Sequence, residues 1–188
     1  MSEMDSLSFL KFIPFNLLLK TIKSKKCFVK NEYTNLLIIL YWIFFRLNPS
    51  EDGSPTESVI TTYFSSFSKE KSLIEKYTEF KELLYSIRLF GISKANLIVG
   101  IQQMNLYPHS YLVKIMLEVQ QSLGHGGDMN IFRCFENQSI RHGFTVDVEN
   151  DTYYSEIFSL YGFHFELVAE QVEHKDNKYT YQFHIQVI

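Results

Sequence analysis

An unbroken run of ten apolar residues, 36–45, dominates the hydrophobic pattern of this chain and contains its only tryptophan, Trp42. Such a segment is apolar on every side of a helix, so it belongs either in the centre of a core or in a membrane. Ten residues are too few to cross a bilayer, which needs about 20. The pattern therefore predicts a buried central helix over 32–47, which Asn48 and Pro49 end.

Helical spacing of apolar residues recurs on both sides of this segment. Residues 6–22 are predicted to form an amphipathic helix, in which Pro14 either introduces a kink or begins a fresh turn. Residues 48–58 contain the Pro, Gly and Ser residues of a typical loop. Further helices are predicted over 58–67, 72–90, 93–104 and 110–123.

After residue 127 the pattern changes from helical spacing to alternation, which is typical of half-buried strands. Strands are predicted over 144–148, 163–172 and 179–187, with a short helix over 151–161. The predicted fold class is α+β: an N-terminal helical bundle over 1–127, then a small β-α-β-β sheet with a C-terminal hairpin over 128–188. This second part is too small for dependable independent stability, so we expect it to pack on the bundle or on a partner.

The register of the C-terminal hairpin follows from the parity of its apolar residues. Phe165 and Leu167 occupy odd positions, as do Phe183, Ile185 and Val187. Directly paired positions in a hairpin sum to a constant, which must be even if odd residues are to face odd residues. This requires a turn of three or five residues, or a two-residue turn combined with a bulge. A plain two-residue turn would place phenylalanines opposite glutamines.

Composition agrees with a folded chain of one domain, or of one domain with a small appendage. The chain has 188 residues, of which 46% are apolar and 16% aromatic, so a real core is expected and disorder is not. Phe (17) and Tyr (12) are abundant, and such aromatic residues are often partly exposed where proteins meet. Two cysteines, Cys27 and Cys134, do not make a disulfide framework. The acidic N-terminus lacks a signal-peptide pattern, so the expected location is the cytoplasm.

Charge is unevenly distributed along the chain. Residues 1–46 contain seven Lys or Arg and three Asp or Glu, a net charge of +4, whereas residues 47–188 have a net charge of −7. One interpretation of the N-terminal excess is an ordinary solvated helix end and loop. The other is a docking surface for an acidic partner such as tubulin, nucleic acid or phospholipid. Its candidate partner-binding residues are Lys20, Lys23, Lys25, Lys26 and Lys30.

No motif points to catalysis, a metal or a cofactor. The six histidines include no pair at metal-ligand spacing. The glycine-rich segment 124–127 follows a predicted helix instead of a strand, so it is read as a helix stop and not as a phosphate-binding loop. The leading hypothesis is accordingly a non-enzymatic binding or scaffolding subunit with no catalytic residue, no metal and no cofactor. Its C-terminal hairpin is a second expected contact, because small sheets expose edges that accept another strand and the terminal strand, rich in Tyr and Phe, has no proline.

Two alternatives remain open. One is a small enzyme whose pocket lies between the helical part and the sheet, with His142, His164 or His184 as the base. The other is a nucleic-acid-binding or ribonucleoprotein subunit, although the negative net charge and the lack of a recognisable motif make nucleic acid an unlikely partner.

Residues 28–52 resemble part of a known family. An aromatic-led segment with Phe28 and Tyr33 enters the apolar helix, Trp42 and then Arg46 follow, and Pro49 lies in an acidic loop. This arrangement is similar to the divergent calponin-homology-like domains of cilium and centriole proteins. They include those of clusterin-associated protein 1, other intraflagellar transport subunits and the first subunit of the tubulin epsilon and delta complex. With the later helices, the resemblance covers residues 6–123.

The resemblance implies a helical interaction module without catalysis, located in the cytoplasm, at the cytoskeleton or in a cilium. Some members of that family contact tubulin through basic surface residues, and others hold partner subunits in an assembly. On this basis the lysines between positions 20 and 30 are the best candidate surface for tubulin or another complex subunit. The last 50 residues depart from the family, whose members usually continue into coiled coil instead of strands.

Overall fold

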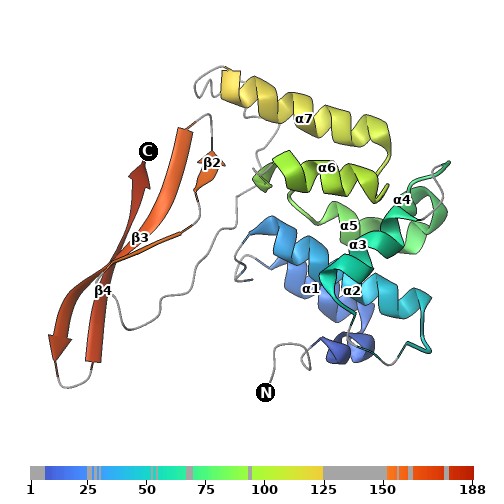
Figure 1. The fold of residues 1–188 in the computed structure, drawn as a ribbon, viewed down its shortest axis with the longest axis horizontal. Coiled ribbons are helices and arrows are strands. Elements are labelled where there is room, and N and C mark those ends of the chain that lie inside the picture. The colour runs from blue at the N-terminus through green and yellow to red at the C-terminus, as the bar shows by residue number, and fades with distance from the viewer. Residues whose placement is uncertain are drawn as a thin grey trace.

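The computed structural model confirms an α+β fold, with helices in the N-terminal part and an antiparallel sheet at the C-terminus (Figure 1). The residues that it describes are 7–24, 27, 29, 31–51, 53, 55–66, 70–92, 95–124, 152–155, 157–160, 163–175 and 178–188. The predicted strand 144–148 and the predicted boundary near residue 127 lie outside them.

The first apolar segment forms two short helices instead of one. A 3₁₀ helix, η2 (Ser8–Phe12), precedes the α-helix α1 (Phe15–Lys23), and Pro14 is the N-cap of α1. Proline is favourable at a helix start because its missing N–H would have no partner there. Of the two alternatives for Pro14, the fresh turn is therefore the one that forms.

The central helix, α2 (Glu32–Leu47), has the bounds that the sequence predicts. The Asn31 side chain caps it by accepting a hydrogen bond from the Thr34 amide at 3.0 Å, and the Phe44 carbonyl accepts one from the Asn48 amide at its end. The segment 39–45 is buried throughout. Helix α2 contacts η2, α3 (Glu57–Ser65), α5 (Lys81–Tyr85) and η4 (Leu89–Gly91), which makes it the centre of the bundle.

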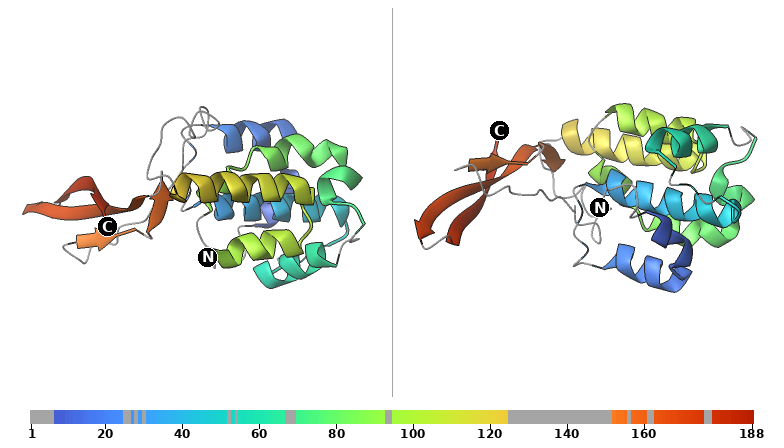
Figure 2. Two further views of the ribbon diagram at one scale, coloured as in Figure 1. Left: turned by 90° about the horizontal axis from the view of Figure 1, so that it is seen from above. Right: turned by 60° about the horizontal axis from the view of Figure 1, so that its bottom comes forward.

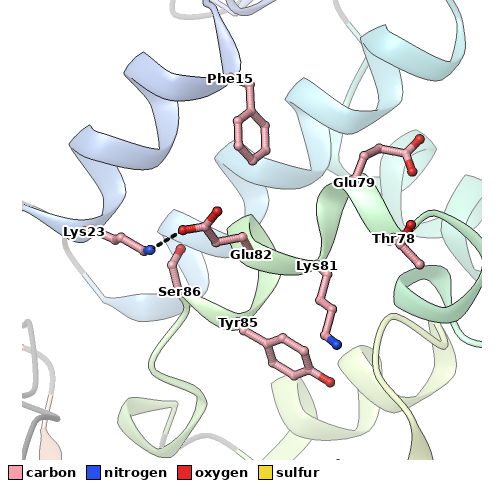
Figure 3. A pocket seen from close by; sticks show the side chains of 8 residues that line it. All are labelled: Phe15, Lys23, Thr78, Glu79, Lys81, Glu82, Tyr85 and Ser86. Carbon is pink, nitrogen blue, oxygen red and sulfur yellow. Dashed lines mark hydrogen bonds and ion pairs between the residues drawn. The ribbon is translucent and has the colours of Figure 1, made fainter.

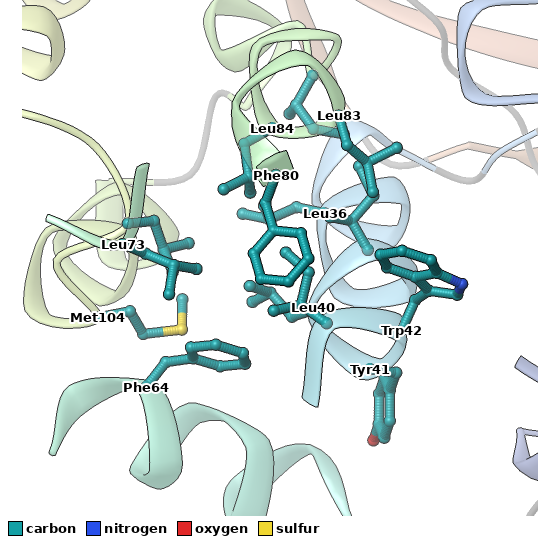
Figure 4. Packing of buried hydrophobic residues seen from close by; sticks show 14 of the residues in the cluster. Leu36, Leu40, Tyr41, Trp42, Phe64, Leu73, Phe80, Leu83, Leu84 and Met104 are labelled. Atoms are coloured by element: carbon teal, nitrogen blue, oxygen red, sulfur yellow. The ribbon is translucent and has the colours of Figure 1, made fainter. Parts of the chain in front are cut away.

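The core of the bundle forms where helices α2 to α5 converge (Figure 4). Trp42 is 3% exposed, and its ring lies 6.0 Å from that of Phe15 and 6.1 Å from that of Phe80. Leu36 and Leu40, one helical turn apart on α2, are fully buried in the same cluster. Burial of this kind is the main favourable contribution to folding, because it removes apolar surface from water.

The single helix predicted over 72–90 is wrong. This segment forms α4 (Leu73–Lys76), the 3₁₀ helix η3 (Thr78–Phe80), α5 and η4. The chain leaves helical geometry at Tyr77 (φ −127°, ψ 83°) and again at Arg88 (φ −88°, ψ 74°). The apolar residues of this segment are buried by several short turns in succession. Their spacing therefore indicates which residues lie inside, but not that one continuous helix carries them.

The other helical predictions are confirmed with small shifts of their ends. Helix α3 corresponds to the prediction for 58–67. Helix α6 (Ala95–Gln103) lies within the predicted 93–104, and α7 (His109–Gly124) covers the predicted 110–123. Helix α7 contacts η4, and η4 also contacts the sheet strand β2 (Phe158–Leu160).

The sheet has four antiparallel strands built around β3 (Phe163–Lys175). Two short strands, β1 (Thr152–Tyr154) and β2, pair with different parts of one edge of β3, and β4 (Lys178–Val187) pairs with its other edge. The predicted helix over 151–161 is therefore wrong, and the predicted β-α-β-β order is corrected at that element. Thr152, Tyr153 and Tyr154 have the β-branched and aromatic side chains that favour strands.

The hairpin register is the predicted one. Phe165 pairs with Val187 and Ala169 with Phe183, so odd positions face odd positions. Lys175 pairs with Lys178, which leaves two residues between the strands, and a bulge lies between Gln171 and Glu173. The observed solution is thus the two-residue turn combined with a bulge. The sheet extends away from the helices, as two further views show (Figure 2).

Candidate functional site

The two faces of the C-terminal sheet differ sharply in chemistry. One face, which we call the apolar face, is made by the odd positions of β3 up to the bulge and by those of β4. With Tyr153 of β1, the members whose side chains the structure describes are Phe165, Leu167, Ala169, Gln171, Tyr181, Phe183, Ile185 and Val187. Alternation of this kind is typical of a sheet that has one face buried against another layer.

The β4 end of the apolar face is nevertheless open to solvent. Phe183 is 65% exposed, Ile185 62% and Val187 60%. The rest of the face is at least partly covered: Ala169 is fully buried, Phe165 and Leu167 are partly buried, and the partly buried rings of Tyr153 and Tyr181 lie 6.0 Å apart. Contiguous exposed apolar residues of this size usually mark an interaction surface, because water contacts them unfavourably.

The same residues of β4 also present main-chain groups at an open edge. The Ile188 amide donates to the His164 carbonyl at 2.9 Å, so even positions of β4 face β3. Main-chain groups alternate in direction along a strand, and the N–H and C=O groups of Phe183, Ile185 and Val187 consequently point away from β3. In the part of the chain that the structure describes, β3 is the only strand paired with β4.

The opposite face, which we call the polar face, has three glutamates along β3, around the buried Val168, and the register places Lys175 and Lys178 on it at the hairpin end. On β3 it contains Glu166 and Glu170 before the bulge and Glu173 after it, because the bulge changes the parity of the strand. Among the residues whose side chains the structure describes, none forms an ion pair with Glu166, Glu170 or Glu173. Their directly paired residues on β4 are neutral: Glu166 pairs with Gln186, Glu170 with Gln182 and Glu173 with Thr180.

Two further features make β4 an unprotected edge strand. It contains no proline, and between its first residue, Lys178, and its end it has no lysine or acidic residue. Native edge strands are usually protected from other strands by charges, prolines or bulges. The bulge of this hairpin lies on β3, so β4 itself remains regular over its C-terminal half.

The structure describes two of the five candidate lysines. Lys20 and Lys23 both lie in the last turn of α1 with exposed side chains, whereas Lys25, Lys26 and Lys30 lie outside the described residues. The Lys23 ammonium lies 2.6 Å from Oε1 of Glu82 on α5. This ion pair joins α1 to α5 and reduces the positive charge that Lys23 offers to a partner.

A groove of about 550 Å³ lies beside this ion pair (Figure 3). Phe15 and Lys23 line it from α1, and residues of η3 and α5 line the other side. Those residues are Thr78, Glu79, Lys81, Glu82, Tyr85 and Ser86. It has no histidine and mixes both signs of charge, so it offers neither a general base of the expected type nor a strongly basic surface.

Of the three histidines named as alternative bases, the two that the structure describes do not line this groove. His164 and His184 are exposed on the polar face of the sheet, as their parity predicts, and His142 lies outside the described residues. Within the described residues, no three His, Cys, Asp or Glu side chains are grouped to hold a metal ion. No described helix is long and apolar enough to cross a bilayer.

The hairpin edge is the second contact expected from the sequence, but the individual exposed residues of β4 are not among the predicted site residues. Their signal was present in the sequence: nine residues, 179–187, alternate between apolar and polar without a charged side chain. Alternation alone predicts a buried face, and only the structure shows that no described element covers Phe183, Ile185 and Val187.

Comparison with known proteins finds one family. Residues 140–188 match the family described as BTB/POZ domain-containing protein 16, C-terminal domain. The matched segment contains all four strands of the sheet and none of the described helices. No solved structure matches the chain.

Proposed function

We propose that this protein is a non-enzymatic interaction subunit that binds a protein partner through the apolar face of its C-terminal sheet. The observation on which this depends is the exposure of Phe183, Ile185 and Val187 on a regular edge strand. A face of this kind is stabilised when a partner removes it from water. The match of this same segment to the C-terminal domain of a BTB/POZ protein supports a role in protein interaction.

Two variants of the full chain test this proposal. The first changes Phe183, Ile185 and Val187 to Ser, which removes the exposed apolar side chains. The control changes Gln182, His184 and Gln186 to Ser, which alters the same strand on the polar face. In-cell crosslinking in the native source, followed by recovery of the tagged chain, should yield a partner with the wild type and the control but not with the first variant. Equal recovery with all three would contradict the proposal.

For the identity of the partner, we propose tubulin or a subunit of a cilium or centriole assembly. The support is the resemblance of residues 6–123 to calponin-homology-like domains and the exposed position of Lys20 at the end of α1. Purified tubulin should co-sediment with the full chain, and Lys20→Glu should weaken this binding more than a charge reversal of Lys114 on α7. No binding at low salt, where charge attraction is least screened, would exclude tubulin as the direct partner.

A further inference from the structure

We propose that the open edge of β4 binds an extended, basic segment of a protein partner by strand addition, antiparallel or parallel to β4. This inference rests on the proposed interaction function and specifies its chemistry. In this mode, main-chain hydrogen bonds to the edge supply affinity, and the alternating side chains of the added strand supply specificity.

The main chain determines which residues form the ladder. The amides and carbonyls of Phe183, Ile185 and Val187 point away from β3, as the direction of the Ile188 to His164 bond establishes. An added strand would exchange hydrogen bonds with these three residues. Its apolar side chains would then extend the apolar face beside theirs, which are 60 to 65% exposed at present.

The polar face determines the charge of the occupant. Adjacent strands lie about 4.8 Å apart, so an added strand would be about 10 Å from β3, with β4 between them. The β4 residues in between, Gln182 and Gln186, are neutral, and long Lys or Arg side chains can extend across them towards Glu166 and Glu170. Among the residues whose side chains the structure describes, none forms an ion pair with those carboxylates, so the complementary segment has Lys or Arg at its polar positions.

A second copy of this chain fits less well. Pairing β4 with β4 of another molecule would continue the apolar face. It would supply no lysine or arginine at positions 179–187, where His184 is the one titratable basic residue. The register places Lys178, the first residue of β4, on this same face, so each copy would add one lysine position at the end of the paired strands and none along 179–187. Charge complementarity therefore favours a basic partner segment over a second copy.

The test uses the full chain and three labelled ten-residue peptides. One alternates Val and Lys, one alternates Val and Glu, and the third has the Val and Lys composition with like residues grouped. We expect the alternating basic peptide to bind at least tenfold more tightly than either of the others. Added salt should weaken its binding, because the attraction to the polar face is electrostatic. Equal affinity for the acidic peptide would overturn the proposal.

Amide hydrogen exchange locates the binding without any mutation. In the free chain the amides of Phe183, Ile185 and Val187 should exchange quickly, and those of Gln182, His184 and Gln186 slowly. The basic peptide should slow exchange at the first three residues. If they remain fast while the peptide is bound, the peptide does not add as a strand. If they are already slow in a chain that sediments as a dimer, a second copy occupies the edge, and the proposal is wrong.

Two variants then separate the main chain from the side chains. Ile185→Pro removes an outward amide and leaves the bonds to β3 intact, whereas Ile185→Ala shortens the side chain and keeps the amide. Peptide affinity should fall at least tenfold in Ile185→Pro and by less in Ile185→Ala.

Changing Glu166 and Glu170 to Gln should weaken peptide binding about tenfold, whereas Glu79→Gln on η3 should leave it unchanged. If Pro leaves peptide binding intact while the Ser variants still lose the cellular partner, the proposed function stands and strand addition fails.

Discussion

The indole Nε1–H of Trp42 donates a hydrogen bond to the carbonyl of Ile13 over 2.8 Å. Ile13 follows η2 directly, so this bond attaches the start of the chain to the middle of the central helix. Arg46 donates to the same carbonyl at 3.1 Å, and its guanidinium lies 4.9 Å from the centre of the Trp42 ring. Trp42 is therefore both a core residue and the anchor of η2.

Trp42→Phe should lower the free energy of unfolding by about 2 kcal/mol, through the lost hydrogen bond and the smaller ring. Arg46→Ala is the matched control, because Trp42 still donates its hydrogen bond to the Ile13 carbonyl and the Arg46 side chain is exposed. It should lower the free energy by less than about 1 kcal/mol. Urea unfolding followed by circular dichroism measures both. Equal losses would mean that the indole is not the principal anchor.

A second anchor joins the segment before α7 to α5. Tyr107 is fully buried, and its hydroxyl donates to the Leu84 carbonyl at 3.0 Å. That carbonyl also accepts from the Ile87 amide, so it keeps a partner in Tyr107→Phe. We expect a loss of about 1 kcal/mol in the free energy of unfolding. Tyr85→Phe, in the same ring cluster but partly exposed, should change it by less than about 0.5 kcal/mol.

Alkaline pH should destabilise the fold through its tyrosines. Burial, the charge of Glu57 and a hydrogen bond to Glu57 raise the pKa of Tyr33 from 10.0 to about 12. Between these values the unfolded chain has lost the proton and the folded chain still holds it. The free energy of unfolding therefore falls as pH rises from 10 to 12, and is unaffected by Tyr33 below 10.

Tyrosinate absorbance and unfolding measured across this range test the assignment. Tyr33→Phe should show a shallower fall in stability above pH 10. Glu57→Gln should lower the pKa of Tyr33, yet leave it above 10.0, because burial is the larger cause. An unchanged Tyr33 titration in Glu57→Gln would show that the carboxylate does not act on the hydroxyl.

Sequence reasoning was most successful where one physical constraint was sufficient. An apolar run is compatible with few environments, so α2 was predicted with its observed ends. Parity made the hairpin register calculable, because a slip of one residue would turn every apolar side chain to the other face. The resulting predictions needed no knowledge of distant contacts.

The errors arose where long-range hydrogen bonds decided the structure. The amides of Leu73 and Ile74 donate to the carbonyls of Asn105 and Leu106, so the start of α4 depends on a segment about 30 residues away. Likewise, the Ser155 amide donates to the Leu167 carbonyl, and the Ser155 hydroxyl accepts from the Leu167 amide, both at 2.9 Å. These bonds hold 152–160 against β3, and helical spacing within that segment could not reveal them.

The bulge at Val172 provides a test of the register. Val172 is 55% exposed and lies between Gln171, paired with Tyr181, and Glu173, paired with Thr180. Deleting Val172 makes these two pairs adjacent and leaves the apolar and polar faces unchanged. We expect the shortened hairpin to keep its cross-strand contacts in nuclear Overhauser spectra and to bind the partner as before. Deleting Ala169 instead should misalign the faces and abolish both.

The ion pair between Lys23 and Glu82 decides how the basic end of α1 should be interpreted. If Lys23 serves the fold, a double-mutant cycle with Lys23→Met and Glu82→Gln should give a coupling energy of about 0.5 kcal/mol, as expected for an exposed pair. If it serves a partner, Lys23→Met should weaken tubulin binding as much as Lys20→Met does. We expect the opposite: Glu82 holds the Lys23 ammonium at 2.6 Å, so Lys20 should contribute more to binding and Lys23 more to stability.

Glu82→Gln should then increase tubulin affinity, because it releases the Lys23 charge. If Glu82→Gln leaves tubulin affinity unchanged, and Lys20→Met and Lys23→Met weaken binding equally, then the Lys23–Glu82 ion pair does not influence binding.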